Sequence, residues 1–376
     1  MEFIDLRKQY EALKDGIDAR IQQVLNRGHY IGGEEVKELA QKLADYCGTK
    51  YCLTCANGTD ALTLALRCFN VQKGDAVFVP DFTFFASAET PALEGATCVF
   101  VDVEERTFNL DADKLEEAIQ EVIREGKLVP KVIISVDLFG LPANYPKIRK
   151  IADKYKLPII EDGAQGFGGS INEKKACSFG DISTTSFFPA KPVGCYGDGG
   201  AIFTDNKEYY DLMCSLAVHG KGSYKYDNVR IGYNSRLDTI QAAILLEKLK
   251  AFQNYELKDR NDIAKHYTDR LGSAFVTPLV PDGFGSSWAQ FTLILNGEAE
   301  RNVIQEKLKA KGIPTMVYYP KSMHEQTAFA DLPDRSEKLA VSTRLSKSVL
   351  SIPMHPYLTT EDVDFIADAL LECKNR

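Results

Sequence analysis

The feature that most constrains this chain is an alternation of short apolar runs with amphipathic segments between about residues 35 and 250. Repeated alternation of strand-length and helix-length segments predicts a mainly parallel sheet covered by helices. The run Val-Ile-Ile-Ser-Val is apolar nearly throughout, as expected of a strand buried on both faces. The predicted strands are Val77–Pro80, Thr97–Val101, Val132–Val136 and Pro158–Glu161, and the predicted helices between them are Ala61–Cys68, Asp113–Ile123 and Tyr145–Tyr155.

The chain length of 376 residues favours one large domain and one smaller domain. Residues 1–25 are predicted to be helical, and Leu237–Phe252 is predicted to be a long helix that leads out of the large domain. We therefore expect a large domain over residues 1–250 and a smaller α/β domain over residues 251–376. In the smaller domain the predicted helices are Tyr255–Leu271, Glu298–Lys311 and Thr360–Cys373, and the predicted loop is Val280–Ser287.

Composition excludes several classes of protein. The net charge of -8 argues against a general nucleic-acid surface, although a local basic pocket for a phosphate remains compatible with it. No apolar run has the roughly 18 residues of a membrane helix, and the N-terminus lacks the layout of a signal peptide, so we expect a cytoplasmic protein. Cys52 and Cys55 form a lone C-x-x-C with no second pair, so we expect buried apolar thiols and no metal site.

The most informative segment is Ser-Phe-Phe-Pro-Ala-Lys-Pro-Val-Gly-Cys-Tyr-Gly-Asp-Gly-Gly, which contains Ser186 and Lys191. Lys191 lies between an aromatic-rich predicted strand and a glycine-dense turn, and another strand follows. A lysine that reacts as a neutral amine must be partly desolvated, because its ordinary pKa is about 10.4. The apolar end of a strand supplies such a setting. The alternative is a surface lysine beside a hairpin.

A second segment places an acid at the end of a buried strand. Asp162 ends the run Pro-Ile-Ile-Glu-Asp, at the edge where open α/β sheets bind ligands. A pyridoxal ring needs an anion beside its pyridine nitrogen, because the protonated nitrogen lets the ring accept electrons. Asp162 is our candidate for that anion. The alternative is a helix N-cap aspartate.

Weaker signals flank these two. Gly58 and Thr59 form a turn that opens an apolar helix, where free amide groups suit a phosphate, although most such turns are simple caps. Phe84 follows a strand and could stack on a flat ring, although aromatic residues there are more often core. Asn234 and Arg236 precede a long helix, and a capping role is the simpler account. One cofactor, pyridoxal 5'-phosphate, explains the lysine, the acid, the phosphate turn and the aromatic together.

These motifs, in this order, resemble those of the DegT-type (DegT/DnrJ/EryC/StrS) nucleotide-sugar aminotransferases over nearly the whole chain. The resemblance implies the fold type I architecture of aspartate aminotransferase, with a seven-stranded-type sheet, and a homodimer with two shared active sites. It implies that Lys191 is the Schiff-base lysine and that Asp162 partners the pyridine nitrogen. By the same resemblance the other cofactor contacts are Gly58, Thr59, Phe84, Gln165, Ser186 and Asn234, the last reaching the neighbouring subunit's cofactor.

The resemblance also implies a transamination from L-glutamate to a keto-sugar carried by a nucleotide diphosphate. The candidate substrate contacts are Tyr30, Ile31, Arg236, Tyr318 and His324. Many relatives have Val-His-Tyr-Pro where this chain has Val-Tyr-Tyr-Pro, so Tyr318 bears on sugar specificity. The closest branch acts on the 3-keto form of UDP-N-acetylglucosaminuronic acid, whose carboxylate Arg236 could meet.

Other substrates and functions stay open at this point. The alternative substrates are 4-keto-6-deoxy and 3-keto-6-deoxy nucleotide sugars. A dehydratase of the same family would have histidine in place of Lys191. A regulatory protein without catalysis on the same fold is the remaining alternative, which the intact lysine, acid and phosphate turn disfavour.

Overall fold

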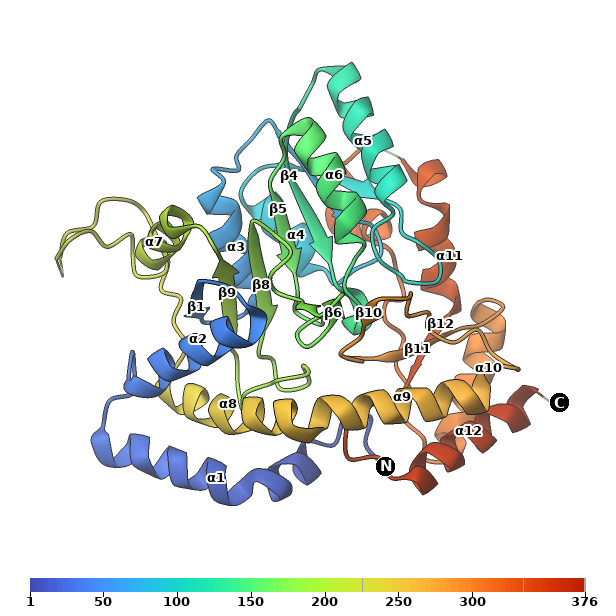
Figure 1. Ribbon diagram of the computed structural model, residues 1–376. Coiled ribbons are helices and arrows are strands. Elements are labelled where there is room, and N and C mark those ends of the chain that lie inside the picture. Colours follow the sequence, from blue (N-terminus) through green and yellow to red (C-terminus); the bar gives the residue numbers. More distant parts are fainter. Residues whose placement is uncertain (225, 334, 375–376) are drawn as a thin grey trace.

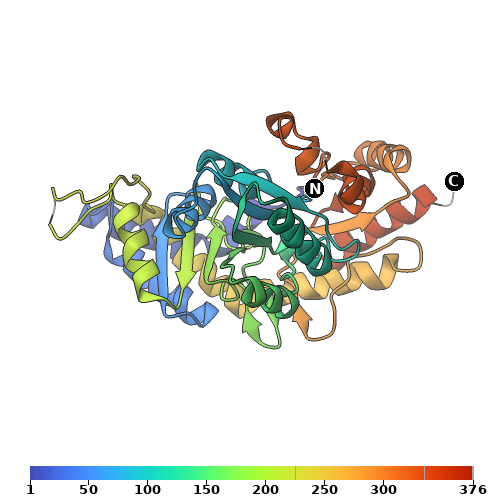
Figure 2. The same ribbon diagram turned by 90° about the horizontal axis from the view of Figure 1, so that it is seen from above.

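The structure is a computed structural model that describes residues 1–224, 226–333 and 335–374. Figure 1 shows a central sheet covered by helices, a long helix beneath it, and a group of helices and short strands near the C-terminus. Figure 2, the view from above, shows the main sheet lying between the segment after α7 (Lys207–Leu216) and these C-terminal helices.

The main sheet has seven strands in the order β1-β9-β8-β5-β4-β2-β3. Their bounds, in that order, are Tyr51–Cys55, Gly200–Thr204, Ile182–Ser186, Ile159–Asp162, Val129–Val136, Asp75–Pro80 and Thr97–Val101. Only β9 runs antiparallel to its neighbours in this sheet. The prediction of a mainly parallel sheet is confirmed, and each of the four predicted strands overlaps an observed one.

Both faces of the sheet are buried. Along β2, Val77 and Val79 pack into the core on one face, whereas Ala76 and Phe78 pack into the core on the other. This alternation follows from the period of two along a strand, and it explains why the strand is apolar throughout. The helices that cover the two faces include α3 (Gly58–Cys68), α4 (Ala86–Leu93), α5 (Ala112–Glu125), α6 (Tyr145–Tyr155) and α7.

A long helix runs past the end of the sheet (Figure 1). It consists of α8 (Thr239–Ala251), a π-helical turn over Phe252–Glu256 and α9 (Leu257–Leu271). The sequence predicted two helices here, but no glycine or proline interrupts residues 239–271, so the helix continues through the turn. The predicted domain boundary at residue 250 therefore falls inside one helix. The helices α1 (Leu6–Arg27) and α2 (Glu34–Cys47) both contact α8.

The C-terminal part is built on two antiparallel strands, β11 (Phe291–Ile294) and β12 (Val349–Ile352). Its helices are α10 (Glu298–Ala310), α11 (Ala340–Ser348) and α12 (Thr360–Lys374), joined by short 3-10 turns. The predicted loop Val280–Ser287 is corrected in one detail: Phe284–Gly285 forms the short strand β10, because it pairs with β6 (Ser170–Ile171). A further short strand, β7 (Lys174–Lys175), pairs with β6 on its other side.

Cys52 and Cys55 are buried free thiols in β1, as predicted. Burial raises the pKa of both. Within the described residues, no helix has the length and apolar character needed to cross a bilayer.

Candidate active site

A cavity of about 410 Å³ opens where the parallel strands end. It is lined by the ends of β4, β5 and β8, by the segments that follow β1, β2, β5 and β8, by Ile4 near the N-terminus and by the C-terminal part. The predicted site residues that line it are Gly58, Thr59, Phe84, Asp162, Gln165, Ser186, Lys191 and Tyr318. Residues from distant positions in the chain therefore meet at one site, as the order of strands and helices predicts.

Lys191 lies in a tight turn that follows β8. Its backbone N–H donates to the carbonyl of Phe188 at 2.8 Å. The turn closes against Gly194, where a Cβ atom would lie 2.4 Å from the carbonyl oxygen of Pro189. The sequence predicted an aromatic-rich strand before Lys191, but β8 ends at Ser186. Phe187 and Phe188 therefore follow the strand and are not part of it. Burial lowers the pKa of Lys191, while the charge of Asp162 acts in the opposite direction. The lysine therefore has the desolvation that a nucleophilic amine needs.

Asp162 is a buried carboxylate held by two donors. The Ser87 hydroxyl donates to its Oδ2 at 2.7 Å, and the Ala164 N–H donates to its Oδ1 at 3.2 Å. Burial raises the pKa of Asp162, and these two hydrogen bonds and Lys191 lower it. A protonated ring nitrogen would give this buried anion a close cationic partner, so the site fits a pyridoxal ring.

The start of α3 forms a second, polar end of the cavity. The Asn57 side chain caps the helix by accepting from the N–H of Asp60 at 2.7 Å. Gly58 lies so close to β8 that a Cβ atom there would be 2.8 Å from Cβ of Ser186. The first amide groups of α3 and the hydroxyls of Thr59 and Ser186 therefore share one corner of the cavity. This arrangement fits a phosphate group.

Between these ends the cavity has an aromatic wall. Phe84 is 53% exposed although it lines the cavity, so its ring is available to pack on a planar ligand. Gln165 is fixed at both ends of its amide: Oε1 accepts from the Phe139 N–H at 2.7 Å, and Nε2 donates to the Tyr319 hydroxyl at 3.0 Å. Burial raises the pKa of Tyr319, which keeps this phenol protonated.

Five predicted residues lie outside this cavity. Tyr30, Ile31, Asn234 and Arg236 are exposed, and none of them lines it. His324 is bonded instead to the buried Asp81, whose Oδ2 lies 2.7 Å from its Nδ1. Roles in ligand binding for these residues stay predictions.

Several residues of the site are not among the predicted ones, and they include four polar residues. Ser87 orients Asp162, Tyr319 bonds to Gln165, and Asp198 and Gln290 line the cavity. Ser87 lies in the same short motif as Phe84, and its spacing of one helical turn from Thr83 could have indicated it. Gln290 belongs to no motif that the sequence reasoning used.

Comparisons with known proteins bear on this arrangement. The model of the DegT/DnrJ/EryC1/StrS aminotransferase family matches residues 11–371. The chain belongs to this family. It is 46% identical over 371 residues, covering 98% of this chain and 99% of the relative, to the UDP-2-acetamido-2-deoxy-3-oxo-D-glucuronate aminotransferase of Pseudomonas aeruginosa.

Solved structures agree with this assignment. A DegT/DnrJ/EryC1/StrS aminotransferase from Brucella abortus superposes with a TM-score of 0.97 and 46% identity over 100% of both chains. The PLP-form of Spr1654 from Streptococcus pneumoniae superposes with a TM-score of 0.89 and 27% identity over 96% of both chains. The protein is thus a pyridoxal-phosphate-dependent aminotransferase with the fold type I architecture, as the sequence predicted.

Proposed function

We propose that this aminotransferase moves the amino group of L-glutamate to a keto-sugar carried by a nucleotide diphosphate. The substrate that we propose is the 3-keto form of UDP-N-acetylglucosaminuronic acid. The observation that carries the reaction class is the meeting of Lys191 and Asp162 in one cavity beside the helix start of α3. The similarity to the Pseudomonas aeruginosa enzyme over 98% of this chain supports the choice of sugar.

Each residue of the cavity has a separate role in the proposed reaction. Bound pyridoxal phosphate supplies an electron sink for the carbon from which a proton departs. Lys191 carries that proton between two carbon positions, and burial favours its neutral, basic form. Asp162 holds the ring nitrogen in its charged form, and Ser87 holds Asp162 in place. Thr59 and Ser186 bind the phosphate, and Phe84 packs on the ring.

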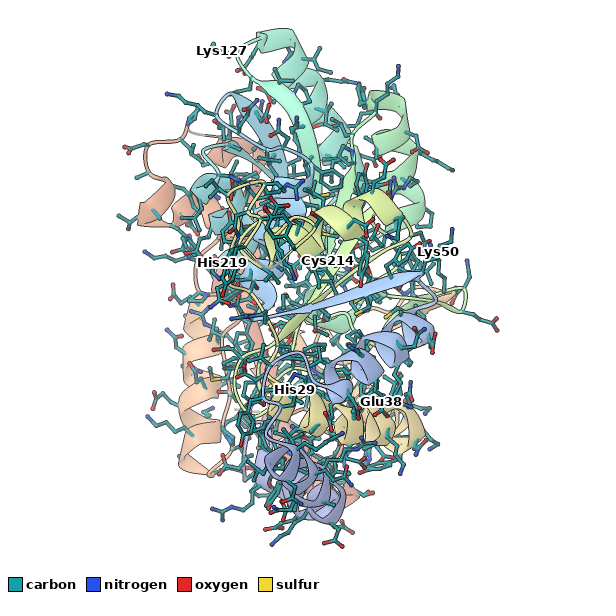
Figure 3. The ribbon with its side chains drawn as sticks, turned by 90° about the vertical axis from the view of Figure 1, so that its left-hand side faces the viewer. His29, Glu38, Lys50, Lys127, Cys214 and His219 are labelled. Atoms are coloured by element: carbon teal, nitrogen blue, oxygen red, sulfur yellow. The ribbon has the colours of Figure 1, made fainter. Side chains whose placement is uncertain are left out.

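We also propose that the enzyme is a homodimer in which each subunit completes the other's site. The described residues between α7 and α8 project from the body of the molecule (Figure 1). Figure 3 faces this side and shows His219 on that segment and His29 on the segment before α2. Ile231 is 83% exposed and Val229 is 54% exposed, an apolar surface that a second copy would cover.

Four of the five predicted residues outside the cavity lie on these same two segments, and His324 does not. The backbone carbonyl of Tyr30 accepts a hydrogen bond from the N–H of Thr239 at 2.8 Å, which ties the segment before α2 to the start of α8. Asn234 and Arg236 directly precede α8 and are exposed. In a dimer they would reach a neighbouring cavity, with Asn234 at the phosphate and Arg236 at the sugar carboxylate.

The experiment follows the two halves of the reaction separately. Purified enzyme is mixed with L-glutamate while its near-visible absorption is recorded, and 2-oxoglutarate is measured. The proposed 3-keto sugar and a 4-keto-6-deoxy sugar nucleotide are then added in parallel. Amination of the 3-keto sugar supports the proposal. Activity on the 4-keto sugar alone would refute the proposed substrate while leaving the aminotransferase assignment intact.

A further inference from the structure

Among the described residues that line the cavity, Gln290 carries a buried polar atom whose hydrogen bonding is incomplete. Gln290 directly precedes β11 and lines the cavity together with Lys191 and Tyr318. Its amide oxygen Oε1 is buried and has no hydrogen-bond partner among the described residues. A buried acceptor without a partner costs about 1–3 kcal/mol, so we expect a donor from outside the chain to meet this oxygen.

The backbone around Gln290 is fixed. Its N–H donates to the carbonyl of Phe139 at 3.3 Å. Three residues earlier, the N–H of Ser287 donates to the carbonyl of Gly140 at 2.9 Å. The Ser287 hydroxyl donates to the carbonyl of Gln165 at 2.8 Å. The segment that carries Gln290 is therefore tied to the turns that follow β4 and β5, and the fold holds the backbone of Gln290 at the edge of the cavity.

We propose that Gln290 determines specificity by accepting a hydrogen bond from the nucleotide-linked keto-sugar. This inference rests on the function proposed above. The bond would run from a sugar hydroxyl or from the acetamido N–H to Oε1. Gln165 is not free to take this role, because both ends of its amide are already bonded within the protein.

L-glutamate and the keto-sugar differ in the hydrogen-bond donors that they can offer to Gln290. An amide oxygen only accepts, so it needs a donor. The two carboxylates of L-glutamate only accept, and its amino group is the group that is transferred to the cofactor. The keto-sugar offers hydroxyl and amide N–H donors. Loss of the Gln290 oxygen therefore weakens the sugar half of the reaction and spares the glutamate half.

The test uses the holoenzyme and the variant Gln290→Leu, which keeps the size of the side chain and removes the acceptor. Gln41→Leu, on the exposed face of α2, is the matched control. The measurements are the rate of the absorption change with L-glutamate, kcat/KM for the 3-keto sugar, and the Kd of its 3-amino product by calorimetry. A thermal unfolding midpoint is recorded for each protein.

For Gln290→Leu we expect kcat/KM to fall and Kd to rise about tenfold, as for the loss of one hydrogen bond of about 1.4 kcal/mol. The glutamate rate stays at the value of the control, and the unfolding midpoint is equal to or above that of the control, because the substitution removes a buried acceptor without a partner. Equal losses in both halves, or an unchanged Kd, would overturn this inference alone. Failure of the wild-type enzyme to bind or aminate the 3-keto sugar would overturn the proposed substrate, and the inference with it.

Discussion

The hydrogen bond from Ser87 to Asp162 offers a sharp test of how this site works. Ser87 is fully buried in α4, and its hydroxyl donates to Oδ2 of Asp162 at 2.7 Å. A hydrogen bond to a charged group contributes about 1.5–3 kcal/mol. The same energy corresponds to a pKa change of about 1–2 units, at about 1.36 kcal/mol per unit. Since this bond lowers the pKa of Asp162, the variant Ser87→Ala raises it.

The direction of the effect on activity follows from that pKa. A carboxylate that takes up a proton more readily is a poorer partner for the ring nitrogen, so we expect kcat to fall about tenfold. The acid limb of the pH–kcat profile moves to higher pH in Ser87→Ala. The assay is the glutamate half-reaction followed by absorption between pH 5 and 9.

Thr90→Val is the matched control for this substitution. Thr90 is also fully buried in α4, but its hydroxyl donates to the carbonyl of Ala86 at 3.0 Å and does not contact Asp162. We expect this control to lose some stability while keeping the wild-type pH profile. A Ser87→Ala enzyme whose acid limb coincides with that of the wild type would refute the reasoning.

Three further predictions concern other groups. Gly58→Ala adds a Cβ atom 2.8 Å from Cβ of Ser186, so we expect the Kd for pyridoxal phosphate, measured by titration of the apoenzyme, to rise at least about tenfold. Burial lowers the pKa of His355 from 6.5 to about 4. The contribution of the neutral imidazole to the free energy of unfolding is therefore fully present above pH 6.5 and is lost as the pH falls toward 4. In urea melts, His355→Gln should remove this part of the acid dependence, about 3 kcal/mol. Lys248 lies buried with its Nζ 4.3 Å from the ring centre of Tyr196, and this atom has no hydrogen bond within the described chain. Burial lowers the pKa of Lys248 to about 8. Lys248→Met should therefore raise the free energy of unfolding at pH 7 by about 2 kcal/mol, and a decrease would contradict this.

Much of the large sheet could be predicted because its signals are local. Strands such as β3 are continuous apolar runs, and α6 begins and ends at the predicted residues because Asn144 caps it and its apolar positions repeat at helical spacing. The long helix through α8 and α9 was predicted in two pieces, since a π-helical turn leaves no mark in the pattern of apolar residues.

The site residues that could be predicted are those whose residue type is required by one part of the cofactor. Lys191 and Gly58 follow strands and Asp162 ends one, and parallel strands place their ends together. Gln290 and Tyr319 come from the C-terminal part, whose position against the sheet depends on packing between distant segments. No pattern of local sequence encodes that packing.

The central claim is that Lys191 is the lysine that binds pyridoxal phosphate in an aminotransferase. The most direct measurement is reduction of the holoenzyme with borohydride, followed by proteolysis and mass spectrometry of the lysine-containing peptides. We predict one pyridoxyl-modified lysine, Lys191, and loss of this label when L-glutamate is added before the reductant. A label on another lysine, or a label at Lys191 that glutamate does not diminish, would contradict the account.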